Sequence, residues 1–106
     1  MAHPSKRKGN GYERELVKGA QDVGFAAERA YASNGKALGE SEDTDLVLED
    51  GHGLRVRIQA KRRKALPAYL QPTPGVDAVV FREDRGASLV LVTWDAYLRL
   101  LASSQP

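Results

Sequence analysis

The sequence predicts an α/β fold, in which helices flank a mixed central β-sheet within a single domain. Three observations predict this fold. The chain has 106 residues, about the length of one ordinary domain. Its residues are 42% hydrophobic and 28% charged, an ordinary globular balance. Helical and strand patterns alternate along the chain, and no repeat or change in composition marks a second domain.

A helix is predicted from Tyr12 to Gly24, because apolar or small side chains recur there at helical spacing. Asn10 is a candidate cap at its start, and Gly24 is a candidate stop. The residues before it, 1–10, are basic and predict a flexible arm.

A hairpin is predicted in the middle of the chain. Residues 46–48 form a short apolar run, and residues 54–59 alternate apolar and polar side chains, as a half-buried strand does. The glycine-rich residues 49–53 between them predict a turn. Residues 25–32 before this hairpin are compatible with a further short strand.

The C-terminal part predicts a second hairpin and a helix. Prolines make residues 65–75 irregular, with room for one short helical turn. Residues 76–81 and 89–92 are rich in strand-forming side chains. Thr93 is a candidate cap for a final helix over residues 94–101.

Composition excludes several kinds of chemistry. The chain has no cysteine, which excludes disulfides, thiolate zinc sites and cysteine nucleophiles. Its two histidines, His3 and His52, fall in a predicted tail and a predicted turn, so catalysis by histidine is not expected. No apolar run approaches the roughly 20 residues that span a bilayer, and no secretory signal is visible. We therefore expect a cytoplasmic protein without a membrane partner, located in the host cytoplasm if a phage encodes it.

The charges cluster although the formal net charge is only +2. Basic residues gather at Lys6–Lys8 and at Lys61–Lys64, and six acidic residues lie between Glu40 and Asp50. This arrangement indicates a phosphate-rich partner bound around a cation-binding centre. The alternative, that these are simply solvated faces, stays open at this point.

The first hairpin can gather chemistry-bearing side chains at one edge of the sheet. Asp45 precedes the first strand, and the expected turn places it opposite the Gln59 region. Side chains alternate along a strand, so Gln59 and Lys61 should emerge on one face, about 7 Å apart. Glu13 can add a second carboxylate if the first helix packs against the sheet.

This group of residues suits metal-assisted hydrolysis of a phosphodiester. Mg²⁺ prefers hard oxygen ligands, which Asp45, the Gln59 side chain and the Ala60 carbonyl can supply. Such an ion polarises the phosphate and lowers the pKa of a bound water. Lys61 is then placed to stabilise charge that develops on the phosphate or to orient the attacking water.

The pattern Glu13…Asp45…Gln59-Ala60-Lys61 resembles the PD-(D/E)xK nuclease superfamily. Within it, the chain is most similar to archaeal-type Holliday junction resolvases and their phage-encoded relatives. The most specific pieces are Lys6-Arg7-Lys8-Gly9 before Tyr12-Glu13-Arg14-Glu15-Leu16, and Thr44-Asp45-Leu46-Val47 before Gln59-x-Lys61.

The resemblance implies a restriction-endonuclease-like fold and an endodeoxyribonuclease of DNA recombination and repair. The expected cofactor is Mg²⁺, with Mn²⁺ as a possible substitute. The expected partners are branched double-stranded DNA and a second copy of the chain, so that a homodimer nicks two strands of a four-way junction.

The resemblance also assigns roles to individual residues. It makes Glu13 catalytic, and it places Arg29 and Ser33 where the family has a contributing arginine and serine. With the residues argued above, the predicted catalytic set is Glu13, Arg29, Ser33, Asp45, Gln59 and Lys61, and the predicted metal ligands are Glu13, Asp45, Gln59 and Ala60. The predicted DNA contacts are the basic residues Lys6, Arg7, Lys8, Arg14, Lys36, Arg62, Arg63 and Lys64.

Two positions depart from the family pattern. Gln59 stands where the family has a glutamate, and Thr44 where it has a proline. A neutral amide binds Mg²⁺ less tightly than a carboxylate, although a Gln-x-Lys pattern resembles restriction enzymes directed at methylated DNA. Two alternatives therefore stay open: another PD-(D/E)xK nuclease of the restriction or repair type, and a catalytically silent module that binds DNA junctions.

Overall fold

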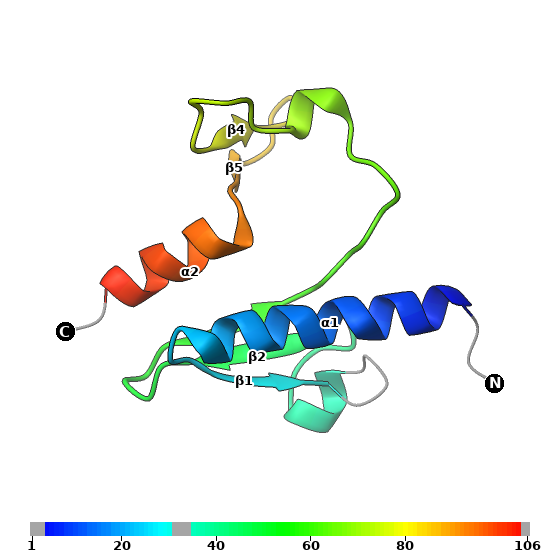
Figure 1. Ribbon diagram of the computed structural model, residues 1–106, viewed down its shortest axis with the longest axis vertical. Helices are drawn as coiled ribbons and strands as arrows, with labels where there is room; N and C mark the ends of the chain where they lie inside the picture. Colours follow the sequence, from blue (N-terminus) through cyan, green and yellow to red (C-terminus); the bar gives the residue numbers. More distant parts are fainter. Residues whose placement is uncertain (1–3, 31–34, 105–106) are drawn as a thin grey trace. The chain divides into compact units, whose positions relative to one another are not determined.

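The computed structural model describes residues 4–30 and 35–104 of the chain, without the side chains of residues 4–10, 35 and 37. Over these residues the chain combines two α-helices with two small antiparallel sheets, which confirms the α/β class (Figure 1). The elements in order are α1 (Pro4–Asp22), β1 (Ala26–Arg29), the 3₁₀ turn η2 (Gly35–Leu38), β2 (Leu46–Glu49), β3 (Arg55–Ile58), the 3₁₀ turn η3 (Ala68–Leu70), β4 (Val79–Phe81), β5 (Leu89–Leu91) and α2 (Trp94–Ser103).

The first helix is longer than the sequence predicted. It begins at Pro4, so Asn10 lies inside the helix and does not cap it, and the backbone of residues 4–10 is helical rather than a flexible arm. Proline suits a first helical turn because its φ is already fixed near the helical value. Each glycine in a helix interior costs only about 1 kcal/mol relative to alanine, so Gly9 weakens the helix without ending it. The predicted stop is confirmed, since Gly24 follows the helix with a φ of 97°.

Three strands form the first sheet, in the order β1-β2-β3, and each pair is antiparallel. Leu46 of β2 pairs with Arg29 of β1 and with Ile58 of β3. The predicted hairpin between β2 and β3 is confirmed, and its turn is closed by Asp50. The Asp50 side chain accepts hydrogen bonds from the backbone N–H groups of His52 (2.7 Å) and Leu54 (3.0 Å).

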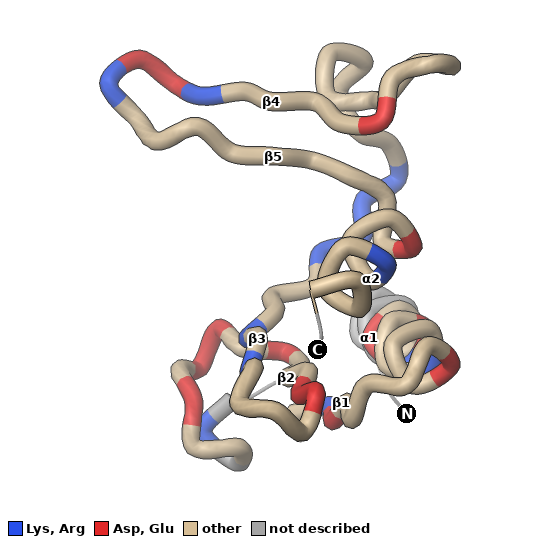
Figure 2. The backbone as a smooth tube through the Cα atoms, turned by 90° about the vertical axis from the view of Figure 1, so that its left-hand side faces the viewer, with Lys and Arg blue, Asp and Glu red and all other residues tan. Residues whose placement is uncertain are grey.

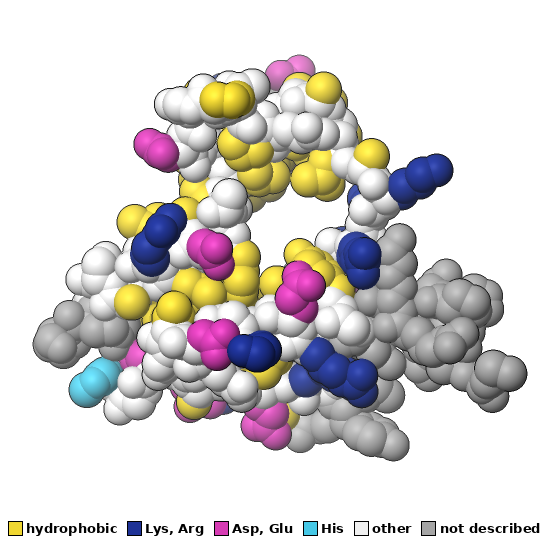
Figure 3. Space-filling view, in the orientation of Figure 1, with side chains coloured by type: hydrophobic (Ala, Val, Ile, Leu, Met, Phe, Trp, Pro, Cys, Tyr) yellow, Lys and Arg dark blue, Asp and Glu magenta, His cyan; other side chains and the backbone are white. Residues whose placement is uncertain are grey.

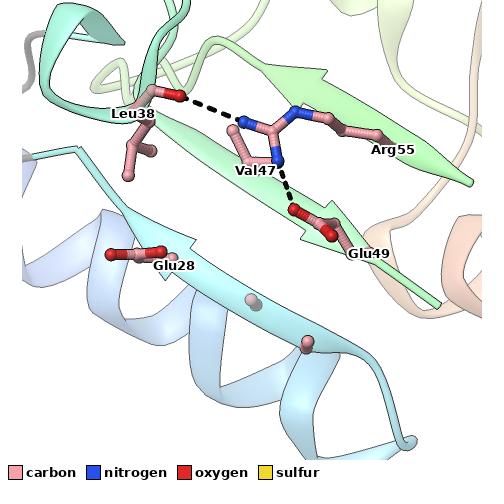
Figure 4. A pocket seen from close by; sticks show the side chains of 7 residues that line it. Glu28, Leu38, Val47, Glu49 and Arg55 are labelled. Atoms are coloured by element: carbon pink, nitrogen blue, oxygen red, sulfur yellow. Dashed lines mark hydrogen bonds and ion pairs between the residues drawn. The ribbon is translucent and has the colours of Figure 1, made fainter. Parts of the chain in front are cut away.

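Helix α1 packs against β1 and β2 and forms the core of this unit (Figure 1). Leu16 and Ala20 are buried on the helix, and Leu46 and Leu48 are fully buried on the sheet. Successive side chains of a strand point to opposite faces. Val47 therefore faces away from α1, toward a pocket on the other side of the sheet, behind which α1 is visible in Figure 4.

The strands form two sheets where the sequence predicted one mixed sheet. β4 and β5 pair with each other in a separate antiparallel hairpin. Within each sheet, neighbours are consecutive in the chain, and the short connections of the β2–β3 and β4–β5 hairpins allow only antiparallel pairing. The chain divides into two compact units, Met1–Arg62 and Arg63–Ser104; a single nuclease domain stays a prediction.

The second unit contains the β4–β5 hairpin and α2. Thr93 caps α2 as predicted, because its hydroxyl oxygen accepts a hydrogen bond from the backbone N–H of Ala96 at 3.1 Å. Leu98 of α2 is buried. The hairpin exposes apolar side chains, among them Val80 and Val90, and hydrophobic atoms are visible on the surface of this unit in Figure 3.

Candidate functional site

Asp45 is the best-fixed residue of the predicted site. Its backbone N–H donates to the Ile58 carbonyl at 2.8 Å, and its carbonyl accepts from the Ala30 N–H at 2.8 Å. Its carboxylate Oδ2 accepts from the backbone N–H of Ala60 at 2.7 Å. Asp45 is therefore held between β1 on one side and the end of β3 on the other.

The hydrogen bonds of Asp45 also interrupt the regular ladder. In a regular antiparallel strand, the N–H and C=O of one residue bond to the same neighbouring strand. At Asp45 the N–H bonds toward β3 and the C=O toward β1. Local disruptions of this kind change the direction in which a side chain points. Here the Asp45 carboxylate points toward the Ala60 N–H and accepts a hydrogen bond from it.

Gln59 lies between Ile58 and Ala60, both of which form hydrogen bonds with Asp45. Its side chain and that of Lys61 are exposed. Among the described residues, neither side chain has a hydrogen-bond partner, and Asp45 Oδ1 accepts no hydrogen bond. Carboxylate, amide and carbonyl oxygens are hard ligands of the type that a divalent cation such as Mg²⁺ prefers. The oxygens that Asp45, Gln59 and Ala60 offer therefore fit such an ion in their chemistry.

The acidic segment between Glu40 and Asp50 does not itself form a cation-binding centre. Within residues 4–30 and 35–104, no three histidine, aspartate or glutamate side chains are grouped closely enough to hold a metal ion. Instead, Glu40 and Glu49 bind arginines of β3, and Glu42 pairs with Lys36 at 2.6 Å. A metal site at Asp45 therefore depends on amide and carbonyl oxygens.

Glu40 accepts from two guanidinium groups. The Nε atoms of Arg55 and Arg57 lie 2.7 and 2.5 Å from its two carboxylate oxygens. These hydrogen bonds, first that of Arg55 and then that of Arg57, lower the pKa of the Glu40 carboxyl below its ordinary value. Figure 2 shows acidic residues in the chain beside basic residues of β3. Neither arginine nor Glu40 was predicted as a site residue, although the alternating pattern of residues 54–59 places both arginines on one face of the strand.

Two further predicted catalytic residues lie on the α1 side of the sheet. Glu13 is only 4% exposed and shares the buried face of α1 with Leu16 and Ala20. Arg29 follows Glu28, which lines the pocket on the opposite face, so Arg29 points toward the α1 side. Its Nη1 atom is buried and has no hydrogen-bond partner within the described part of the chain. Such groups are uncommon and call for an explanation, and a ligand that contacts Arg29 would supply one.

The predicted DNA contacts are placed to different extents. Arg14, Lys36, Arg62, Arg63 and Lys64 are exposed, and Lys36 is bound to Glu42. Lys6, Arg7 and Lys8 belong to α1, and their side chains lie outside the description. Ser33 also lies outside the described residues.

The class of protein comes from the comparison with family models, in which the chain matches a family of PD-(D/E)xK nucleases. The family model for "Archaeal holliday junction resolvase (hjc)" matches residues 4–97, and the chain belongs to this family. It is a Holliday junction resolvase, a nuclease of DNA recombination and repair that acts on four-way junctions. Searches of curated proteins and of solved structures found no match. The resemblance seen in the sequence is thereby confirmed.

Two further findings bear on cofactor and partners. The family is one of nucleases that depend on a divalent metal and act on junction DNA. Neither α1 nor α2, over the residues that the structure describes, has the length and apolar character needed to cross a membrane.

Proposed function

We propose that this resolvase cuts each junction strand by Mg²⁺-dependent hydrolysis at a site formed by Asp45, Gln59, Ala60 and Lys61. The observation that supports this site is the 2.7 Å hydrogen bond between the Asp45 carboxylate and the Ala60 amide. It brings the acidic residue before β2 to the segment after β3, so that oxygen ligands from both segments lie close together.

Each residue then has a defined task. Asp45, Gln59 and the Ala60 carbonyl hold the ion, and Glu13 is the second carboxylate of the site. When bound, Mg²⁺ polarises the phosphate and lowers the pKa of the attacking water. Lys61 stabilises the negative charge that develops on the phosphate oxygens. Arg29 and Ser33 assist through contacts with the same phosphate.

The basic residues after β3 position the DNA. Arg62, Arg63 and Lys64 are exposed, and no ion pair holds them among the described residues. Contacts of such residues with phosphates fix the register of the duplex without reading its sequence. The other proposed DNA contacts are the exposed Arg14 and Lys36 and the basic residues of α1 in the first unit.

The proposed assembly is a homodimer of single-domain subunits. Four-way junctions have two strands to be cut, and a twofold dimer presents two sites to them. The exposed apolar side chains of the β4–β5 hairpin support a protein interface in the second unit. Light scattering coupled to size-exclusion chromatography should give a dimer mass of about twice 11.6 kDa; a monomer at micromolar concentration would refute this assembly.

Gln59 favours a second candidate function, that of a silent junction-binding module. A neutral amide replaces the carboxylate of the family pattern, and no cluster of three acidic residues compensates for it within the described chain. Such a protein would keep the DNA surface without cutting.

Two variants distinguish these functions. Asp45→Asn keeps the shape of the side chain but removes its charge, and Lys61→Met removes the ammonium group while it keeps an unbranched side chain. We expect both variants to bind four-way junctions and to lose cleavage in Mg²⁺. Cleavage by Asp45→Asn at the wild-type rate would refute the proposed site. Tight binding without cleavage by the wild-type protein, in Mg²⁺ and in Mn²⁺, would establish the silent module.

A further inference from the structure

Three side-chain contacts hold the segment before β2 against β3. Arg55 Nε donates to Glu40 Oε2 at 2.7 Å, and Arg57 Nε donates to Glu40 Oε1 at 2.5 Å. Arg55 Nη2 also donates to the Leu38 carbonyl at 3.2 Å. We call Glu40, Arg55 and Arg57 the clasp.

The clasp is more than an ordinary surface ion pair. Exposed pairs contribute little, because water screens them and long side chains lose freedom. The Glu40 side chain, in contrast, is only 12% exposed, and both of its oxygens are bonded. Arg55 has three acceptors, Glu40, Glu49 and Leu38, and Figure 4 shows it reaching between the last two. Charge-assisted bonds of this geometry fix both partners in place.

A short and well-bonded connection joins the clasp to Asp45. The Thr44 N–H donates to the Ser41 carbonyl at 3.1 Å, and the two hydroxyl oxygens lie 3.3 Å apart. Thr44 is buried, with 5% of its surface exposed. These contacts restrain the conformation of the turn between Glu40 and Asp45. A displacement of Glu40 is therefore expected to displace Asp45 as well.

On its other side the clasp is joined directly to the second half of the site. Arg55 and Arg57 belong to β3, which ends at Ile58, and Gln59 and Ala60 follow directly after it. Glu40 thus ties the segment that leads into Asp45 to the strand that leads into Gln59.

We propose that Glu40, Arg55 and Arg57 are positioning residues of the nuclease site, which set the approach of Asp45 to the Gln59-Ala60 segment. The expected effect on metal binding and cleavage rests on the proposed function. The expected effect on the position of Asp45 does not. Catalytic groups displaced by about 1 Å can lose on the order of a hundredfold in rate. The clasp therefore acts on metal binding and cleavage through the position of Asp45.

The experiment compares amide hydrogen exchange and Mg²⁺ dependence in Glu40→Gln. The exchange of the Ala60 N–H, which bonds to Asp45, should become at least about tenfold faster as local opening becomes easier. The N–H of Leu16 in α1 should exchange at the wild-type rate. In junction cleavage, the half-saturating Mg²⁺ concentration should rise roughly three- to tenfold, while junction affinity in EDTA stays that of the control.

Asp22→Asn is the matched control, because it also removes one carboxylate from an ion pair, that with Lys18 on the exposed side of α1. Glu40→Asp keeps the charge and should recover part of both effects. If Glu40→Gln does not fold, Arg57→Gln removes one of the three contacts from a side chain that is 60% exposed, and it should show the same effects to a smaller extent.

Unchanged Ala60 exchange in a folded Glu40→Gln or Arg57→Gln protein would overturn the proposal. A loss of protection equal at Ala60 and Leu16 would also overturn it, because the clasp would then be only a contributor to global stability. If the wild-type protein cuts no junction, the proposed function fails, but the exchange result still decides whether the clasp positions Asp45.

Discussion

Gln59→Glu restores the carboxylate that the family pattern has at this position, and it tests whether Gln59 is a metal ligand. Gln59 is exposed, so the dielectric constant near that of water applies. At the Mg²⁺–oxygen distance of about 2.1 Å, a full negative charge is worth about 4 kcal/mol to a divalent ion in water. Loss of the amide oxygen and dehydration of the new carboxylate offset a large part of this. We expect a net gain of about 1.4 to 2.8 kcal/mol, which is a ten- to hundredfold lower half-saturating Mg²⁺ concentration.

The same substitution should destabilise the metal-free protein. A carboxylate at position 59 would lie close to that of Asp45, and two carboxylates about 5 Å apart repel by about 0.8 kcal/mol in water. Thermal unfolding in EDTA should therefore show a slightly lower midpoint than that of the wild type. Saturating Mg²⁺ should reverse the order, because a ligand that binds only the folded state stabilises it.

Both effects can be measured by titrating Mg²⁺ in junction cleavage and in thermal unfolding. Gln71→Glu is the control for cleavage, since it makes the same change of charge at an exposed position of the second unit. In thermal unfolding it also loses the hydrogen bond from Gln71 Nε2 to the Leu66 carbonyl at 3.0 Å, so it controls the cleavage titration alone. An equal half-saturating Mg²⁺ concentration in Gln59→Glu and wild-type protein would refute the reasoning that makes Gln59 a ligand.

Three other predictions follow from the structure. Replacing Arg62, Arg63 or Lys64 by alanine should lower the slope of log affinity against log salt by about 0.9 per residue, as measured by junction binding at increasing salt. Thr93→Ala removes the cap of α2 and should lower the free energy of unfolding by about 1 kcal/mol in urea titrations. The lowered pKa of Glu40 stabilises the fold above the ordinary carboxyl pKa of 4.5. That contribution is lost as the pH falls below 4.5 through the lowered pKa, so acid unfolding of Glu40→Gln should be less steep there.

Each of these predictions has a control in the same chain. Arg99→Ala removes an exposed arginine of α2 and should leave the salt slope unchanged. Thr93→Ser keeps the capping oxygen and should retain most of the stability. Asp22→Asn is the control for acid unfolding. A salt slope that changes as much in Arg99→Ala as in Arg62→Ala would argue against a specific phosphate surface after β3.

The elements that could be predicted are those that local chemistry determines. The β2–β3 hairpin follows from alternating side chains and from a turn that Asp50 closes, and the cap of α2 follows from Thr93 alone. The start of α1 could not be predicted, because Gly9, Asn10 and Gly11 have low helix propensity. That preference is weak, and the helix that begins at Pro4 continues through all three residues.

The candidate site was predictable only in part. The sequence indicated that Asp45 and the Gln59 region approach each other, because the hairpin register depends on turn length. It did not indicate that Glu40 binds Arg55 and Arg57, which are 15 and 17 residues further along the chain. That pairing depends on how the connection between η2 and β2 folds back on β3, and no local pattern encodes it. The acidic segment was therefore interpreted as a cation site, whereas most of its members bind arginine, lysine or backbone groups.

The most direct test of the central claim is cleavage of a labelled four-way junction beside a linear duplex of the same arms. The wild-type protein in Mg²⁺ should produce paired nicks in the junction and leave the duplex intact, and Asp45→Asn should produce none. Equal cutting of junction and duplex, or junction cutting that survives in Asp45→Asn, would contradict a resolvase whose chemistry depends on Asp45.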